Sequence, residues 1–175
     1  RSDLFDLIRA TPNLTWLLLT KRPGNIAKMW RDADVEHLHW PRNAAIGCTV
    51  VNQGEADRDV PKLLAAKAEL KPAFAFLSME PLLGPVDLSA HLWGRAAPCS
   101  ECSRDADCGC GFYPRGACDG ETTLDWVITG GETDQGAHKA RLTHHRWLLD
   151  IRDQCAAAGV AYHHKQHGEW APVRW

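Results

Sequence analysis

Apolar positions along the chain follow two spacings, one typical of buried strands and one typical of helices. Short runs that are apolar on both faces predict five strands of a covered sheet. These strands are expected at Thr15–Thr20, Ala44–Val50, Ala73–Met79, Leu124–Thr129 and Val160–Lys165. Because helical spacing occurs between them, we expect one α/β domain with a mainly parallel sheet, either open or part of an α/β barrel.

The first helix is expected before the first strand. Ser2 or Asp3 caps it, and Leu4, Leu7 and Ile8 lie on one of its faces.

Three further helices are predicted between the strands. One begins after Pro23, and the next covers residues 54–68, with Pro61 as an alternative start because proline suits the first helical turn. The last helix has Thr143 as its N-cap and ends at Gly159, a residue suited to a left-handed C-terminal position.

Composition and charge narrow the class of protein. Hydrophobic residues make up 45% and charged residues 24%, which excludes a disordered or collagen-like chain. The net charge of −2 excludes a broad basic field for nucleic acid but leaves local basic contacts open. The apolar run Trp16–Leu19 is much shorter than the ~20 residues of a membrane span. With no leader pattern after Arg1, we expect a cytoplasmic protein without a membrane partner, starting within a longer polypeptide.

Polar or glycine residues follow each predicted strand. Carboxyl ends of parallel strands meet at one edge, so we expect a shared cleft there. The candidate residues of this cleft are Lys21, Arg22, Thr49, Asn52, Ser78, Glu80, Gly130, Gly131, Glu132, Lys165 and Gln166. The glycine pair lets backbone N–H groups approach a ligand, and Glu132 can accept hydrogen bonds from an amine or ribose. Lysine beside Glu80 also suits acid–base chemistry; the alternative is a set of solvated charges that fixes loop geometry.

Histidines gather near the last strand and the last helix. They are His144, His145, His163, His164 and His167. No cysteine or carboxylate stands at metal-ligand spacing from them, so we interpret them as surface or capping residues.

A cysteine-rich insert is expected at residues 94–120, between core segments 1–93 and 121–175. The insert contains no Leu, Ile, Val or Met, so it needs another source of folding energy. Its five cysteines are Cys99, Cys102, Cys108, Cys110 and Cys118. Four thiolates around a structural zinc ion would supply that energy, with an iron–sulfur cluster or a loop of free thiols as the alternatives. Cys48 and Cys155 are expected in the core.

Four segments, spread over nearly the whole chain, carry a family resemblance. They are LLLTKRPGNI (17–26), FLSMEPLLGPVDL (76–88), DWVITGGET (125–133) and RDQCAAAGVAYHHKQHGEW (152–170). In this order they resemble the phage three-Cys-motif family, named for phage gene products thirty-seven and sixty-eight. That family is similar to radical-SAM enzymes and, distantly, to spore photoproduct lyase.

The resemblance implies a partial TIM-like barrel of the radical-SAM type. The positions that match are Lys21, Arg22, Pro23, Glu80, Pro81, Gly130, Gly131, Glu132, Lys165 and Gln166, and in such barrels strand-end residues contact S-adenosylmethionine or substrate. Val51 stands where the family has a carboxylate and His167 where it has tryptophan.

The family's cluster motif, Cys-x3-Cys-x2-Cys, is absent because no cysteine precedes Cys48. The resemblance therefore implies that the 4Fe-4S cluster and S-adenosylmethionine chemistry need a missing N-terminal part of the same protein, and a three-Cys-motif protein is an implied partner. It also implies a bacterial host or phage-infected cell. A barrel fragment leaves a strand edge unpaired, so we expect an exposed apolar strip beside Thr15–Thr20 or Ala44–Val50.

Two hypotheses of function follow. The first is an enzyme, the C-terminal part of a radical-SAM-like protein that modifies an unknown substrate such as a nucleic-acid base or a host protein. The alternative is a non-catalytic zinc-binding interaction module that contacts a partner protein or nucleic acid. A three-cysteine motif upstream of Arg1 favours the enzyme, and a start codon close to Arg1 favours the module.

The insert generates a prediction about metal content. We expect about one zinc ion per chain, held by four of the five insert cysteines with zinc–sulfur distances of ~2.3 Å. Elemental analysis of protein purified without added metal measures this. Iron in place of zinc would support the cluster alternative, and a metal-free chain with an ordered insert would contradict both.

Overall fold

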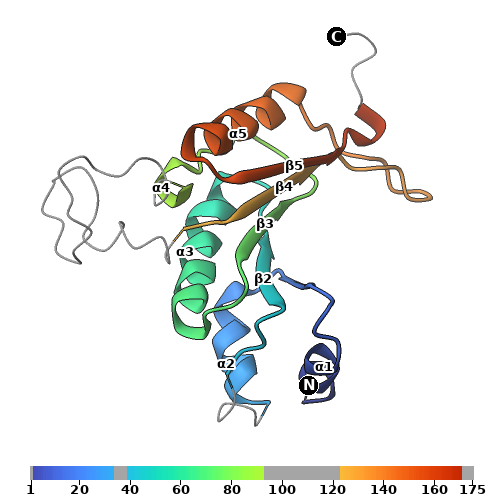
Figure 1. Ribbon diagram of the computed structural model, residues 1–175. Helices are drawn as coiled ribbons and strands as arrows, with labels where there is room; N and C mark the ends of the chain where they lie inside the picture. Colours follow the sequence, from blue (N-terminus) through green and yellow to red (C-terminus); the bar gives the residue numbers. More distant parts are fainter. Residues whose placement is uncertain (1, 34–38, 93–122, 171–175) are drawn as a thin grey trace, which may run out of the picture.

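The computed structural model describes residues 2–33, 39–92 and 123–170 as an α/β fold built on a five-stranded sheet (Figure 1). The strands are β1 (Trp16–Thr20), β2 (Ala44–Thr49), β3 (Ala75–Met79), β4 (Trp126–Gly130) and β5 (Ala161–Gln166). The α-helices are α1 (Ser2–Ala10), α2 (Ile26–Arg31), α3 (Gln53–Leu70), α4 (Ser89–Leu92) and α5 (His145–Ala158). Two 3-10 helices, η1 (Pro23–Asn25) and η2 (Gly168–Trp170), complete these elements. The five predicted strands are confirmed, but the expectation that the first strand is covered on both faces is wrong, because Leu17 and Leu19 of β1 are exposed.

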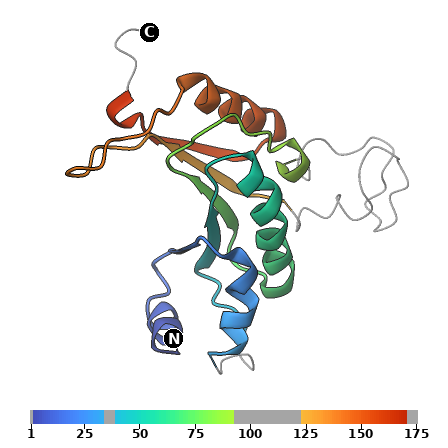
Figure 2. The same cartoon turned by 180° about the vertical axis from the view of Figure 1, so that it is seen from behind.

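The strands pair in the order β1-β2-β3-β4-β5, and every pair is parallel. Each new strand is added at the same edge of the sheet. With right-handed crossovers, this order keeps the connecting helices on one face of the sheet. Figures 1 and 2 show α3 and α5 on that face. We call it the helix face, and the opposite one the open face.

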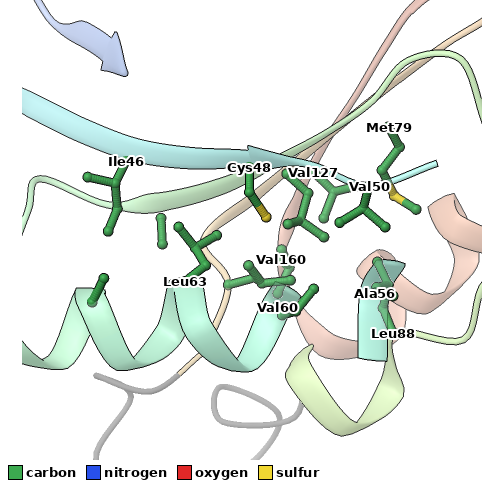
Figure 3. Packing of buried hydrophobic residues seen from close by; sticks show 14 of the residues in the cluster. Ile46, Cys48, Val50, Ala56, Val60, Leu63, Met79, Leu88, Val127 and Val160 are labelled. Atoms are coloured by element: carbon green, nitrogen blue, oxygen red, sulfur yellow. The ribbon is translucent and has the colours of Figure 1, made fainter. Parts of the chain in front are cut away.

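The core lies between the helix face and the helices. From β2, Ile46 and Cys48 point toward α3, where Val60 and Leu63 meet them, and all four side chains are buried (Figure 3). Complete burial of a side chain such as Leu63 contributes about 1.5–3 kcal/mol to stability. The expectation that the second strand is covered and that Cys48 belongs to the core is confirmed, and Cys155 is also buried there.

The apolar face expected for helix α1 is buried only in part. Phe5 and Ile8 are buried, whereas Leu4 and Leu7 are exposed. The physical reason is an aromatic contact: the Phe5 ring meets Trp30 edge-on, with ring centroids 4.8 Å apart. This contact places Phe5 in the core beside Ile8, while Leu4 and Leu7 remain exposed.

The ends of two other helices also differ from expectation. Helix α3 begins at Gln53, with Pro61 inside it, because the Asn52 side chain caps the helix by accepting a hydrogen bond from the Glu55 backbone N–H. Helix α5 is capped by the His144 ring, which accepts from the Arg146 N–H, and not by Thr143. Gly159 ends α5 in the left-handed conformation, as predicted.

The predicted insert of residues 94–120, with Cys99, Cys102, Cys108, Cys110 and Cys118, lies outside the described residues. Among the helices that the structure describes, none has the length and apolarity needed to cross a membrane.

An apolar strip runs beside β1, which is an edge strand among those described. Leu17 and Leu19 are 44% and 51% exposed. Between α1, β1 and α2 lies an apolar groove of about 440 Å³, lined in part by Leu4, Ile26 and Met29. The expected strip beside the first strand is therefore present.

The open face generates a prediction about Gly47. A methyl group there would lie 2.6 Å from ring carbon Cε1 of Phe76, which covers this glycine on the neighbouring strand. Gly47→Ala should therefore lower the free energy of unfolding by about 1–3 kcal/mol, the usual range for overpacking. Urea unfolding measures this, with Gly84→Ala as the control because an added methyl group there meets nothing within 4 Å. Equal effects of the two substitutions would contradict the packing argument.

Candidate functional site

A polar cavity of about 210 Å³ lies at the carboxyl ends of the strands. The residues lining it come from the last residue of β2, from the segments after β1, β2 and β3, from the first turns of α3 and from the loop before α5. They are Lys21, Thr49, Val51, Glu55, Arg58, Asp59, Glu80, Pro81 and Arg141. Three of these side chains are cationic and three are carboxylates, so the cavity suits a charged or zwitterionic ligand.

Glu80 and Lys165 meet at this edge although 85 residues separate them along the chain. Lys165 Nζ donates to Glu80 Oε2 at 2.9 Å, which connects the end of β3 with the end of β5. The Glu80 side chain lies against Gly130, where an added methyl group would be 3.1 Å from Glu80 Cγ. The absence of a side chain at Gly130 therefore lets Glu80 lie across the end of β4.

The second glycine, Gly131, serves a backbone contact. A methyl group on Gly131 would overlap the carbonyl oxygen of His167. Its N–H donates to the Gln166 carbonyl oxygen at 2.8 Å, and the Gln166 side chain donates back to the Gly131 carbonyl oxygen at 3.3 Å. Gly131 and Gln166 thus connect the ends of β4 and β5 at the carboxyl edge of the sheet.

Glu132 is engaged by Arg141. Its carboxylate accepts hydrogen bonds from the Arg141 backbone N–H at 2.8 Å, from Nε at 3.0 Å and from Nη2 at 2.9 Å. His138 Nε2 lies 3.4 Å from the same carboxylate. The side-chain hydrogen bonds from Arg141, followed by its backbone N–H, lower the pKa of Glu132 to about 2. Glu132 therefore holds the loop that brings Arg141 to the cavity.

Lys21 and Arg22 follow β1, and both are exposed. Lys21 lines the cavity. Among the salt bridges of residues 2–33, 39–92 and 123–170, none involves Lys21 or Arg22. These side chains are thus cations that an incoming anionic group can pair with.

Asn52 and Ser78, both expected in the cleft, are not among the residues that line the cavity. Asn52 Oδ1 accepts from the Glu55 N–H at 3.0 Å, so its side chain caps α3. Glu55 in turn accepts from the Val51 N–H at 3.0 Å. Ser78 is half-buried on β3, in register with Thr49. Asn52 thus shapes the site through the helix start.

Asp59 is a nearly buried carboxylate that strand-end reasoning missed. Arg58 donates to it through Nε at 3.1 Å and Nη2 at 2.5 Å, and Lys62 Nζ donates at 3.2 Å. The hydrogen bonds from Arg58 are the main cause of the lowered pKa of Asp59. Glu55, Arg58 and Asp59 stand three and four positions apart in α3, which places them on a single face of the helix. This spacing is the sequence signal that could have identified Asp59 as a site residue.

The histidines of β5 lie on opposite faces of the sheet. His163 is exposed, whereas His164 Nδ1 lies 3.2 Å from Thr129 Oγ1 on the helix face. Burial, followed by the charges of His167 and His163, lowers the pKa of His164. Within the described part of the chain, no three His, Cys, Asp or Glu side chains come together as metal ligands.

Comparison with known proteins identifies a family. The whole chain, residues 1–175, matches the family described as Protein of unknown function (DUF5131), and the chain belongs to that family. No curated protein and no solved structure matches the chain.

The contact between Glu132 and Arg141 generates a prediction about pH. Because the folded-state pKa of Glu132 is about 2 instead of 4.5, its contribution to stability is complete above pH 4.5 and is lost as the pH falls toward 2. Glu132→Gln should remove this part of the pH dependence. Thermal unfolding across that pH range measures it, with Glu69→Gln, an exposed surface carboxylate, as the control. An unchanged pH profile in Glu132→Gln would contradict the assignment.

Proposed function

We propose that this member of the DUF5131 family is the C-terminal part of a radical-SAM-like protein of the phage three-Cys-motif type, and that the strand-end cavity binds S-adenosylmethionine or substrate. The observation that carries the proposal is the gathering of Lys21, Glu80, Arg141 and Lys165 at the carboxyl ends of parallel strands. Barrel enzymes build their sites at this end of the sheet.

The strand order supports a partial TIM-like barrel. In a barrel each strand is added beside the previous one in sequence, and all helices lie outside. The order β1-β2-β3-β4-β5, with helices on one face, has this pattern, and the open face would then be the barrel interior. The exposed Leu17 and Leu19 at the β1 edge support association with the missing N-terminal part of the same protein.

The charged groups suit the amino-acid part of S-adenosylmethionine. Glu80 would hold the ammonium group, and Lys21 with Arg141 would hold the carboxylate. The three-cysteine motif is absent, and Cys48 and Cys155 are buried with pKa values raised by burial to about 12 and about 11. A 4Fe-4S cluster therefore does not fit the described residues, and the radical chemistry of such enzymes needs the cluster as well as the cofactor.

The proposal extends to partners and location. A three-Cys-motif protein is the proposed partner, and the cytoplasm of a bacterial host or phage-infected cell is the proposed location. The alternative, a non-catalytic zinc-binding interaction module, is favoured by one observation, the apolar groove of about 440 Å³ beside β1, since such a groove suits a protein partner.

The proposal predicts binding without turnover. We expect the isolated chain to bind S-adenosylmethionine in isothermal titration and to form no 5′-deoxyadenosine after anaerobic iron–sulfide reconstitution. Lys21→Met and Glu80→Gln should weaken binding about tenfold or more, because each removes a charge-assisted contact. Their melting temperatures should stay close to that of the unchanged chain, because both side chains lie at the sheet edge.

Lys28→Met, on the exposed surface of α2, is the matched control and should bind as the unchanged chain does. No detectable binding, or equal weakening by the control, would contradict the assignment of the cavity. Formation of 5′-deoxyadenosine above a cluster-free control would contradict the need for a separate cluster-binding part.

A further inference from the structure

The short helix η2, which follows β5, packs against the loop that carries Arg141. This loop of residues 132–141 lies between β4 and α5, and we call it the arginine arm. Figures 1 and 2 both show η2, drawn in red, beside the base of the arm. None of the three residues of η2 lines the strand-end cavity, so any effect of η2 on a ligand there has to pass through the arm.

Gly168 permits a close approach between η2 and the base of the arm. Its φ is +70°, in the left-handed region, and an added methyl group would overlap the carbonyl oxygen of Glu132. The N–H of Glu169 donates to the same carbonyl oxygen at 3.0 Å. A side chain at position 168 would therefore separate η2 from Glu132.

Two side chains of η2 extend this contact along the arm. The Glu169 carboxylate accepts a hydrogen bond from the Asp134 N–H at 3.3 Å. Trp170 Nε1 donates to the carbonyl oxygen of Ala140 at 3.0 Å. Because Ala140 directly precedes Arg141, the indole fixes the backbone immediately before the arginine. Helix η2 thus holds the arm near both of its ends.

Arg141 is held through one edge of its guanidinium group. Nε and Nη2 each donate one hydrogen bond to the Glu132 carboxylate. A guanidinium group has five N–H donors, so Glu132 leaves three of them, including both donors on Nη1. Arg141 lines the cavity together with Lys21. The remaining donors therefore form a fixed fork that suits a planar carboxylate.

We propose that η2 positions Arg141 for the carboxylate of the bound ligand, with Trp170 as the positioning residue. The inference rests on the proposed function, in which Lys21 and Arg141 hold the carboxylate of S-adenosylmethionine. Lysine is a point charge on a flexible stem, whereas the planar arginine fork gives direction. An arm that is ordered before binding also avoids the entropic cost of ordering it when the ligand binds. The fixed arm thus selects ligands that have a carboxylate.

The test compares two ligands by isothermal titration, S-adenosylmethionine and its decarboxylated form, which lacks only the carboxylate. Trp170→Phe keeps an aromatic ring but removes the indole N–H. It should weaken binding of S-adenosylmethionine about three- to tenfold, the range for one lost hydrogen bond. Binding of the decarboxylated ligand should not change, because this ligand has no group for Arg141. Trp170 is 50% exposed, so the melting temperature should stay the same.

A double variant tests whether Trp170 acts through Arg141. Arg141→Met should weaken binding of S-adenosylmethionine, and adding Trp170→Phe to it should cause no further loss. Trp16→Phe is the matched control, because Trp16 Nε1 also donates a hydrogen bond, to Thr11 Oγ1 at 2.9 Å. Trp16 begins β1 and so lies at the opposite end of the strands from the cavity. This control should bind both ligands as the unchanged chain does.

Hydrogen exchange of the Arg141 amide, followed by NMR without ligand, separates the positioning from the proposed function. This amide donates to the Glu132 carboxylate, and we expect it to exchange at least about threefold faster in Trp170→Phe. Unchanged exchange, equal weakening of both ligands, or additive losses in the double variant would overturn the proposal, as would an equal effect of Trp16→Phe. Absence of S-adenosylmethionine binding to the unchanged chain would contradict the proposed function, and the exchange rates would then decide whether η2 positions Arg141.

Discussion

Parallel pairing of the strands in sequence order is the constraint on which the rest of this structure depends. Each crossover runs in the same direction along the sheet, so α3 and α5 share one face and the other face has no described helix over it. The same constraint brings the carboxyl ends of all strands to one edge. The buried core and the polar cavity therefore occupy separate regions of one sheet.

Close backbone approaches then shape the edge. Gly130 leaves space for the Glu80 side chain, and Gly131 leaves space for the His167 carbonyl group. These contacts bring β3, β4 and β5 together, so that Lys165 reaches Glu80 across the end of β4. The short polar segments after the strands serve two purposes at once, because they fix the edge and carry the charged groups of the cavity.

The strands were predictable because each contains a short apolar run, as at residues 44–49. Their burial was not, since Leu17 and Leu19 of β1 are exposed and no described helix covers the open face. The burial of Phe5 in α1 was not predictable, since it depends on a tertiary contact with Trp30.

Lys21 and Glu80 were predictable as site residues because each directly follows a strand that the sequence predicts. Arg141 was not predictable, because it reaches the cavity only through its contact with Glu132 inside an irregular loop.

The central claim is that the carboxyl edge of the sheet is a ligand site. Its most direct test is an NMR titration of the isotope-labelled chain with S-adenosylmethionine, because amide shifts locate a bound ligand. The account predicts shifts concentrated after the strands, at Lys21, Glu80, Arg141 and Lys165. Shifts confined to the apolar groove between α1 and α2, or no shifts at saturating ligand, would contradict it.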